Sequence, residues 1–300
     1  LFSLRLNRLP GQVSSVEVRA ADPFIMGLPL RAEGRFDGIQ QDSTYGKQGY
    51  GLEVGYRLGG GLQIFGTINR EVTRPGQGGI RLVDGRQRIA RAAAFFAGLG
   101  VRIQRLDRRI NPRRGFLVET NFEQGRKERT ARVVRREAEA APDTTIERLL
   151  LRQERLQAEG RLYLPLFTRQ VLVVGGEVSV LLSDQYDLSD LFRFGGATSL
   201  RGYNEEQFKG RFVTRVFTEY RFQIDRSSYA FLFFDLGYHE QPEIVDPDAA
   251  NVLPQVQGVH PGYGVGFQIG TDLGLINVSL AANPDDPTGI RAHLGLSIGL

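Results

Sequence analysis

The sequence predicts an all-β protein, a transmembrane antiparallel β-barrel with a loop that enters its lumen. Apolar and polar residues alternate with a period of two over most of the chain, as in strands with one apolar face. Glycine accounts for 37 of 300 residues, about 12% against an average near 7%. No apolar run reaches the roughly 20 residues of a membrane-spanning helix. The mean hydropathy of −0.24 fits a barrel that exposes only alternate residues to lipid.

The composition also excludes many kinds of functional site. The absence of cysteine excludes disulfides, thiolate metal sites and a cysteine nucleophile. The three histidines, His239, His260 and His293, lie in separate segments without the spacing of a metal site. The sequence has no nucleophile elbow and no phosphate-binding glycine loop, and a net charge of +4 is too small to indicate nucleic-acid binding without a localised patch. We therefore expect no enzyme, no cofactor, no metal and no nucleic-acid partner.

Strands of alternating polarity fill the first third of the chain. In residues 50–58, for example, Leu52, Val54 and Tyr56 fall on one face and Glu53 on the other. The same pattern predicts strands over residues 1–8, 13–21, 28–38, 50–58, 61–71 and 92–106. A charged side chain facing lipid at the bilayer midplane costs about 2 to 4 kcal/mol. We therefore expect the uncharged faces to meet lipid and the polar, glycine-rich faces to line the lumen.

The middle of the chain, residues 115–166, begins and ends as a strand but is densely charged in between. We interpret the charged part as a hairpin that continues beyond the membrane. An amphipathic helix is the alternative, because Ile146, Leu149, Leu150 and Leu156 have helix-like spacing. The basic residues of this stretch are also placed to reach lipopolysaccharide phosphates, although most charge runs are simply solvated.

Alternation resumes after the charged stretch and continues to the end of the chain. The remaining strands are expected over residues 168–182, 211–222, 228–238, 262–271, 275–281 and 289–300, with a long loop over 183–209. The total of about fourteen is ordinary for an outer-membrane barrel and unusual for a soluble sandwich. Because no linker divides the chain, we interpret residues 1–300 as one barrel domain.

The long loop differs from a plain surface loop because it is apolar and also carries an arginine. Residues 192–210 read FRFGGATSLRGYNEEQFKG, with Arg201 among aromatic and aliphatic residues. If this loop folds into the barrel, a buried arginine is costly unless it is paired. Glu219 and Asp235 face the lumen by the parity of the next two strands, and one guanidinium can bind two carboxylates. Spacing alone leaves two interpretations open, a lumenal arginine bound to both carboxylates, or a surface arginine with Asp235 at a strand end.

These residues also resemble a known family. The segment GGATSLRGY, with Gly195, Gly196, Arg201, Gly202 and Tyr203, is similar to the lumenal-loop motif of the BamA/TamA outer-membrane assembly-factor superfamily, also called the bacterial surface antigen family. The resemblance extends to Thr218-Glu219-Tyr220, to Phe234-Asp235-Leu236-Gly237, to LDRRINPRRG at 106–115 and to VEVRAADPF at 16–24. Five strands follow the loop, as in the family.

The resemblance implies roles for individual residues. Arg201 would anchor the loop through Glu219 and Asp235, and the motif would be completed by Gly195, Gly196, Gly202, Tyr203 and Gly237. The first and last strands would meet at a weak seam, a lateral gate where client strands pair with exposed backbone groups. The last strand would carry a barrel-assembly signal at His293, Gly295, Ile298 and Leu300, with aliphatic residues at the last two positions where aromatic ones are usual.

The resemblance further implies a location and a function. We expect a barrel of the bacterial outer membrane that assists insertion or translocation of proteins, or of lipids, through the lateral gate. Its partners would be outer-membrane lipids and lipopolysaccharide, client polypeptides, and partner chains that supply a periplasmic function. The alternatives are a diffusion pore, a structural partner barrel in a larger complex, and a membrane anchor for an enzyme domain.

The chain departs from the family in two respects. The family's barrel has sixteen strands, so we expect either that two N-terminal strands are missing from this chain or that it closes with about fourteen. No helical periodicity precedes the barrel, so we expect no POTRA modules, the family's periplasmic β-α-α-β-β units, in the chain.

Overall fold

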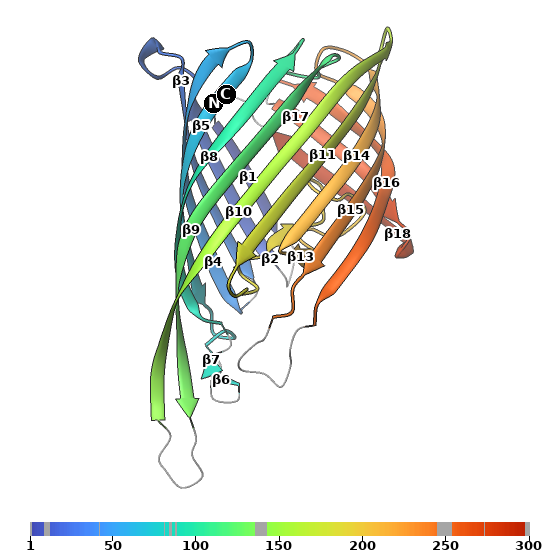
Figure 1. Ribbon diagram of the computed structural model, residues 1–300. Coiled ribbons are helices and arrows are strands. Elements are labelled where there is room, and N and C mark those ends of the chain that lie inside the picture. The colour runs from blue at the N-terminus through green and yellow to red at the C-terminus, as the bar shows by residue number, and fades with distance from the viewer. Residues whose placement is uncertain are drawn as a thin grey trace.

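The computed structural model describes residues 2–8, 13–41, 43–80, 82–83, 86–87, 89–135, 143–244, 254–272 and 274–297. These residues form a tall antiparallel barrel in which β1 begins and β18 ends at the same rim (Figure 1). Within the described ranges, no helix is long and apolar enough to cross a membrane. The predicted all-β fold is confirmed.

Fourteen strands of the described chain form the wall, in the hydrogen-bonded order β1-β2-β3-β4-β5-β8-β9-β10-β11-β14-β15-β16-β17-β18. Their bounds are β1 (Phe2–Arg8), β2 (Val13–Asp22), β3 (Leu30–Gln41), β4 (Tyr45–Gly59), β5 (Leu62–Pro75), β8 (Arg91–Leu106), β9 (Gly115–Arg135), β10 (Asp143–Phe167), β11 (Gln170–Ser183), β14 (Phe212–Gln223), β15 (Tyr229–Gln241), β16 (Val256–Thr271), β17 (Gly274–Asn283) and β18 (Asp286–Ser297). The short strands β6 (Leu82–Val83) and β7 (Arg86–Gln87) lie in the connection from β5 to β8 and pair with each other. The short strands β12 (Phe192–Phe194) and β13 (Phe208–Gly210) form a separate two-stranded sheet. A 3₁₀ turn, η1 (Ile25–Gly27), precedes β3.

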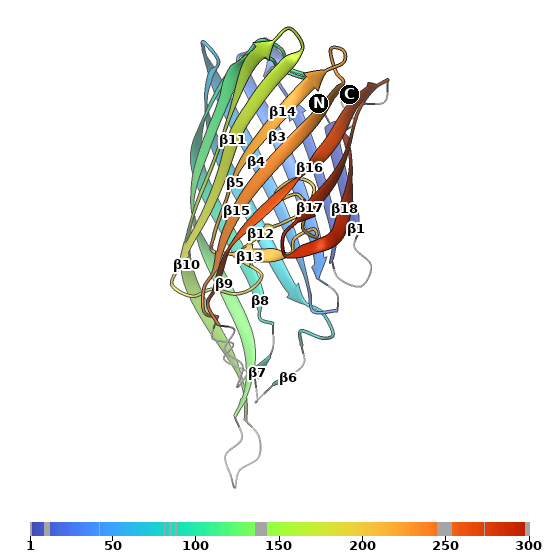
Figure 2. The same cartoon turned by 90° about the vertical axis from the view of Figure 1, so that its right-hand side faces the viewer.

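The first and last strands of this order lie beside each other. β1 and β18 are in contact along one side of the barrel (Figure 2). The sheet therefore curls round until its two ends meet, and we call the line between β1 and β18 the seam.

The two faces of the wall differ as the alternation predicts. On the outside Leu99 is 72% exposed, whereas on the inside Lys127 is 1% exposed. The glycines of the inner face make room for aromatic rings on neighbouring strands. A Cβ on Gly264 would lie only 2.8 Å from the ring of Phe233. The high glycine content is thus a packing requirement of the lumen, in which a ring on one strand covers a glycine on the next.

The connections at the two rims differ in length. At one rim, residues 60–61 join β4 to β5 and residues 168–169 join β10 to β11. At the other rim, residues 184–211 join β11 to β14. Outer-membrane barrels have short periplasmic turns and longer extracellular loops, so the rim with the long loops is the extracellular one.

The charged middle of the chain forms the longest hairpin. β9 and β10 pair from Gly115 opposite Tyr163 to Arg135 opposite Asp143, and they project beyond the wall (Figure 1). The hairpin interpretation is confirmed, although the charged stretch begins within the wall, where residues 125–130 still pair with β8. The helical alternative is wrong over these residues, because a continuous ladder holds both strands extended. Residues 136–142 lie outside the described part of the chain.

Several boundaries differ from the sequence prediction; β4, for example, begins at Tyr45 rather than at 50. β16 begins at Val256, six residues before the predicted 262, because its ladder with β15 continues to the pair Gln241 and Val256. β3 begins at Leu30 rather than at 28, since η1 occupies the preceding residues. The loop predicted over 183–209 contains β12 and β13, which pair with each other.

Candidate functional site

The connection between β11 and β14, residues 184–211, turns back into the barrel, and we call it the lumenal loop (Figure 2). Its side chains Phe194, Leu200 and Tyr203 form a buried cluster with Val213 of β14. Leu200 is 0% exposed. Burial of these apolar side chains explains why the loop is so much more apolar than a solvated surface loop.

The paired glycines set the course of the lumenal loop backbone. Gly195 and Gly196 have φ values of 119° and 99°, which residues with a Cβ rarely adopt. A Cβ on Gly196 would lie 2.2 Å from the carboxyl carbon of Glu205. The backbone N–H of Ala197 donates to Glu205 Oε1 at 2.6 Å, so the loop closes around this carboxylate.

Arg201 lies between two carboxylates on neighbouring wall strands. Its Nε donates to Asp235 Oδ2 at 2.8 Å and its Nη2 to Asp235 Oδ1 at 2.6 Å, which is a bidentate pair. Nη1 donates to Glu219 Oε1 at 2.6 Å. The backbone N–H of Arg201 also donates to Asp235, at 3.1 Å. Asp235 is completely buried, so the geometry is that of a lumenal arginine bound to both carboxylates.

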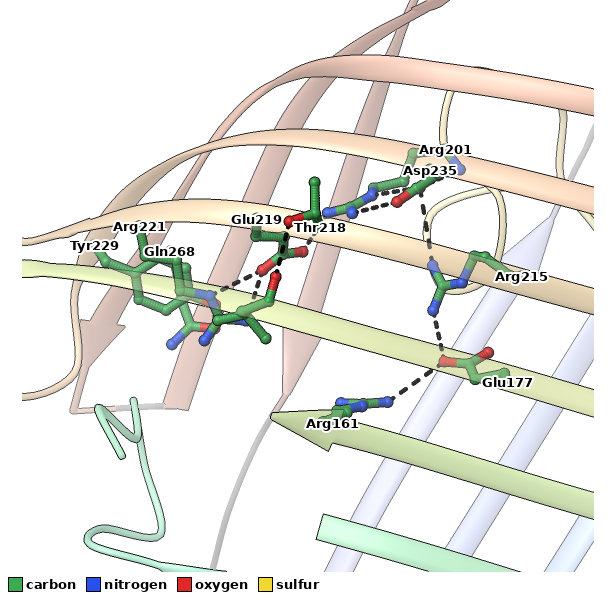
Figure 3. A network of polar contacts seen from close by, with 11 residues as sticks. Arg161, Glu177, Arg201, Arg215, Thr218, Glu219, Arg221, Tyr229, Asp235 and Gln268 are labelled. Carbon is green, nitrogen blue, oxygen red and sulfur yellow. Dashed lines mark hydrogen bonds and ion pairs between the residues drawn. The ribbon is translucent and has the colours of Figure 1, made fainter. Parts of the chain in front are cut away.

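A wider network of arginines and carboxylates surrounds this pair (Figure 3). Arg221 donates from Nε to Glu219 Oε2 at 2.8 Å. Arg215 lies 3.9 Å from Asp235 and donates to Glu177 Oε1 at 2.6 Å. Each buried carboxylate therefore faces guanidinium groups on two sides, which limits the cost of removing these charges from water.

An aromatic ring completes the surroundings of Arg201. Its guanidinium carbon lies 3.7 Å from the centre of the Phe233 ring, within range of a cation–π interaction. Phe233 lies two residues before Asp235 on β15, so it has the same lumen-facing parity. Sequence reasoning missed this role because both faces of the segment are apolar, although the parity of Asp235 indicates it.

Gly202 and Tyr203 connect the lumenal loop to the last strands of the wall. The N–H of Gly202 donates to His293 Nε2 at 3.3 Å, and its carbonyl accepts from Asn283 Nδ2 at 2.5 Å and from Arg291 Nη1 at 3.0 Å. The Tyr203 hydroxyl lies 3.1 Å from the Pro261 carbonyl oxygen and 3.0 Å from Asp285 Oδ2. The loop thus contacts β17 and β18 as well as β14 and β15.

Two wall glycines allow the loop to approach this closely. A Cβ on Gly237 would lie 2.5 Å from the ring of Phe194. A Cβ on Gly262 would lie 1.9 Å from the carbonyl oxygen of Arg201. Gly237 belongs to the motif recognised in the sequence, whereas Gly262 was missed. The strand register could have indicated Gly262, because it pairs directly with Asp235.

The protonation states of the loop residues follow from their contacts. Burial lowers the pKa of Arg201, but hydrogen bonding to Asp235 and the charge of Glu219 outweigh it and raise that pKa above its ordinary value. Burial and the hydrogen bond to Asp285 raise the pKa of the Tyr203 hydroxyl. Arg201 is therefore cationic, and Tyr203 remains a neutral hydrogen-bond donor.

The other residues singled out in the sequence fall in several places. His293 and Gly295 lie on β18, where His293 contacts the lumenal loop as well as belonging to the expected assembly signal. Ile298 and Leu300 lie outside the described residues. The ring nitrogens His239 Nδ1 and His260 Nε2 are 3.1 Å apart, although sequence spacing separated them. Across the described ranges, no group of three or more metal-ligating side chains gathers.

An all-β wall with an apolar outside, a charged inside and a loop held in its lumen defines an outer-membrane β-barrel. The Omp85 superfamily domain matches residues 38–300. The chain therefore belongs to the Omp85 superfamily, and its location is the bacterial outer membrane. No curated protein matches the sequence.

Solved structures with a similar fold include two outer-membrane barrels. BamA from Haemophilus ducreyi, in a form lacking POTRA domains 1–3, is 14% identical with a TM-score of 0.59, and the match covers 99% of this chain and 63% of that one. CdiB from Acinetobacter baumannii is 11% identical with a TM-score of 0.49, covering 98% of this chain and 58% of that one. This chain thus spans less than two thirds of the length of either protein.

Proposed function

We propose that this barrel assists the insertion of polypeptides into the outer membrane, or their passage across it, at the seam between β1 and β18. The observation that carries the proposal is the position of the lumenal loop. Through Arg201 the loop is bound to β14 and β15, and through Gly202 it is bound to β18, one of the two strands of the seam. The loop can therefore support the β18 side of the seam from within.

The physical basis of such an activity is strand addition. When β1 and β18 separate, each presents unpaired backbone N–H and C=O groups to a client strand. A client strand forms hydrogen bonds with these groups, so its addition at the seam needs little net energy. The Arg201 anchor keeps β14 and β15 and the lumenal loop in place while the seam opens. Client polypeptides, and partner chains on the periplasmic side, belong to this proposal.

Cysteine cross-linking tests the proposal directly, because the chain has no native cysteine. Cysteine pairs are placed along β1 and β18 until one forms a disulfide. A matched control is Val16→Cys with Gly38→Cys, which are directly opposite each other on β2 and β3. We expect the seam disulfide to stop insertion of a reporter barrel and reduction to restore it, while the control disulfide has no effect. Full insertion by the cross-linked seam variant would refute the proposal.

A diffusion pore is a second candidate, favoured by a polar cavity in the lumen. The cavity has a volume of about 420 Å³ and is lined by charged side chains that include Arg31, Glu53, Arg102 and Glu119. Its charges are paired, as in Arg102 with Glu53 at 2.9 Å. Planar-bilayer recording separates the two functions. A steady, large conductance supports the pore, and a low, flickering conductance supports a barrel occupied by its lumenal loop.

A further inference from the structure

Arginines occupy the outward face of four adjacent strands near the extracellular rim. Arg70 on β5 lies opposite Phe95 on β8, Phe95 opposite Arg126 on β9, and Arg126 opposite Arg152 on β10. Phe95 is 53% exposed on the outside of the barrel, and directly opposed residues share a face. These three arginines therefore point away from the lumen in a single row.

A second row of arginines lies four residues nearer to the extracellular rim. Arg91 on β8 lies opposite Thr130, and Thr130 lies opposite Arg148 on β10. Arg74 has the outward parity of Arg70 on β5. All the arginines of both rows are exposed. We call them the outer arginine band, which consists of Arg70, Arg74, Arg91, Arg126, Arg148 and Arg152.

The outer arginine band has an excess of positive charge. The carboxylates at outward positions of β9 and β10 at this level are Glu128 and Glu154. Within the described chain, the ion pair formed by the band joins Arg152 to Glu154 at 2.6 Å. Arg126 and Arg152 are like charges directly opposite each other, an arrangement that is destabilising in a sheet. An anion between the two guanidinium groups would remove that repulsion.

The depth of Arg91 places the second row of the band at the membrane surface. The outward residues of β8 are apolar from Ile103 to Ala93, a span of ten residues. At about 3.4 Å per residue and a tilt of about 40°, they cover about 26 Å of membrane thickness, close to the roughly 25 Å apolar band of such barrels. Arg91 is the next outward residue, so it lies where hydrocarbon gives way to headgroups of the outer leaflet.

An apolar hollow adjoins the band on the same outward face. It has a volume of about 730 Å³, and Arg74 lies at its edge. Val16, Phe36 and Val72 line it, and Gly38 is among its lining residues. Val16 lies opposite Gly38, and Gly38 has no side chain to fill the space. The hollow thus offers room for an acyl chain next to an exposed guanidinium group.

We propose that the outer arginine band binds the phosphate groups of phosphorylated glycolipids in the outer leaflet, with an acyl chain in the adjoining hollow. Guanidinium groups form bidentate, charge-assisted hydrogen bonds with phosphate, and these bonds strengthen at the edge of a low-dielectric hydrocarbon layer. A lipid fits better than an acidic protein, because the band borders directly on the lipid-facing belt and on an apolar hollow.

Native mass spectrometry of the purified barrel with defined lipids tests the proposal. The probes are lipid A with two phosphates and dephosphorylated lipid A. The test variant combines Arg91→Gln, Arg126→Gln and Arg152→Gln. A matched control removes the same charge from exposed arginines at the periplasmic rim, as Arg109→Gln, Arg114→Gln and Arg226→Gln. Heat-dependent electrophoretic mobility verifies that every variant is a folded barrel.

We expect diphosphorylated lipid A to bind the wild type about tenfold more tightly than the dephosphorylated form, a difference of about 1.4 kcal/mol. The test variant should lose this preference and the control should keep it. Equal binding of the two lipids by the wild type, or an unchanged preference in the test variant, overturns the proposal. A third outcome also overturns the proposal. If a protein co-purifies with the wild type but not with the test variant, and both bind the lipids equally, the band belongs to a protein partner instead.

Discussion

Replacement of Asp235 by asparagine should release the lumenal loop from the wall. The Asp235 carboxylate is fully buried and accepts three hydrogen bonds from Arg201, at 2.6, 2.8 and 3.1 Å. Removal of one partner of a buried ion pair costs about 3 to 5 kcal/mol. Asparagine retains one acceptor oxygen and Glu219 still binds Arg201. We therefore expect the free energy of loop docking to fall by the lower end of this range, about 3 kcal/mol. This should raise the population of the undocked loop roughly a hundredfold.

Trypsin provides the assay, because the lumenal loop contains Arg193 and Lys209, and both side chains are partly buried when the loop is docked. Cleavage after these residues should accelerate in the Asp235→Asn variant in proportion to the undocked population. Glu240→Gln on the same strand is the matched control. Its pair with Arg211 at 2.5 Å is partly exposed, so its loss costs less than about 1 kcal/mol and changes cleavage less than about fivefold.

A double-mutant cycle checks that the effect belongs to the ion pair. In an Arg201→Gln background, Asp235→Asn should add far less than it does alone, since the interaction is already lost. Cleavage of the folded Asp235→Asn variant at the wild-type rate would refute the reasoning. In that case the apolar contacts of Leu200 and Tyr203 hold the loop without help from the charges.

Two further predictions concern backbone positions. Gly262→Ala should also increase tryptic cleavage of the loop while leaving the wall folded, because the new methyl group would collide with the Arg201 carbonyl oxygen, 1.9 Å from the ideal Cβ. Gly34→Ala on β3, where a Cβ meets nothing within 4 Å, is its control. In the turn that joins β14 to β15 at the periplasmic rim, hydrogen bonds from Ser227 and Ser228 lower the pKa of Asp225 from 3.8 to about 2. Amide protection of Ser227 and Ser228 should therefore persist below pH 3.8 and disappear as the pH falls through about 2. Loss of protection at the ordinary aspartate pKa would contradict this.

The strands could be predicted from sequence because lipid and lumen impose opposite demands on alternate residues. That rule alone predicts that Leu52 faces lipid and Glu53 faces the lumen, as the structure has them, without any knowledge of neighbours in space. Strand ends were less predictable. β16 extends to Val256 only because β15 offers it a partner there, and pairing between strands is a property of the folded wall.

The contacts of the candidate site also differ in how far they could be predicted. The pairing of Arg201 with Glu219 and Asp235 could be predicted, because a buried charge requires a partner and parity shows which carboxylates face inward. The contact of Gly202 with His293 could not be predicted, because 91 positions separate the two residues and no rule of periodicity connects a loop to a distant strand. Gly262 was missed for a related reason, since the need for a glycine there is set by the backbone of another segment.

The contacts of Gly202 have a consequence for the order in which this protein folds. Its partners Asn283, Arg291 and His293 are made late in synthesis, 81 to 91 positions after Gly202 itself. The loop can bind Glu219 and Asp235 earlier, but it cannot complete its bonds until β17 and β18 have joined the wall. Closing so long a stretch of chain is slow compared with forming hairpins. Full docking of the loop therefore requires that β17 and β18 have already joined the wall.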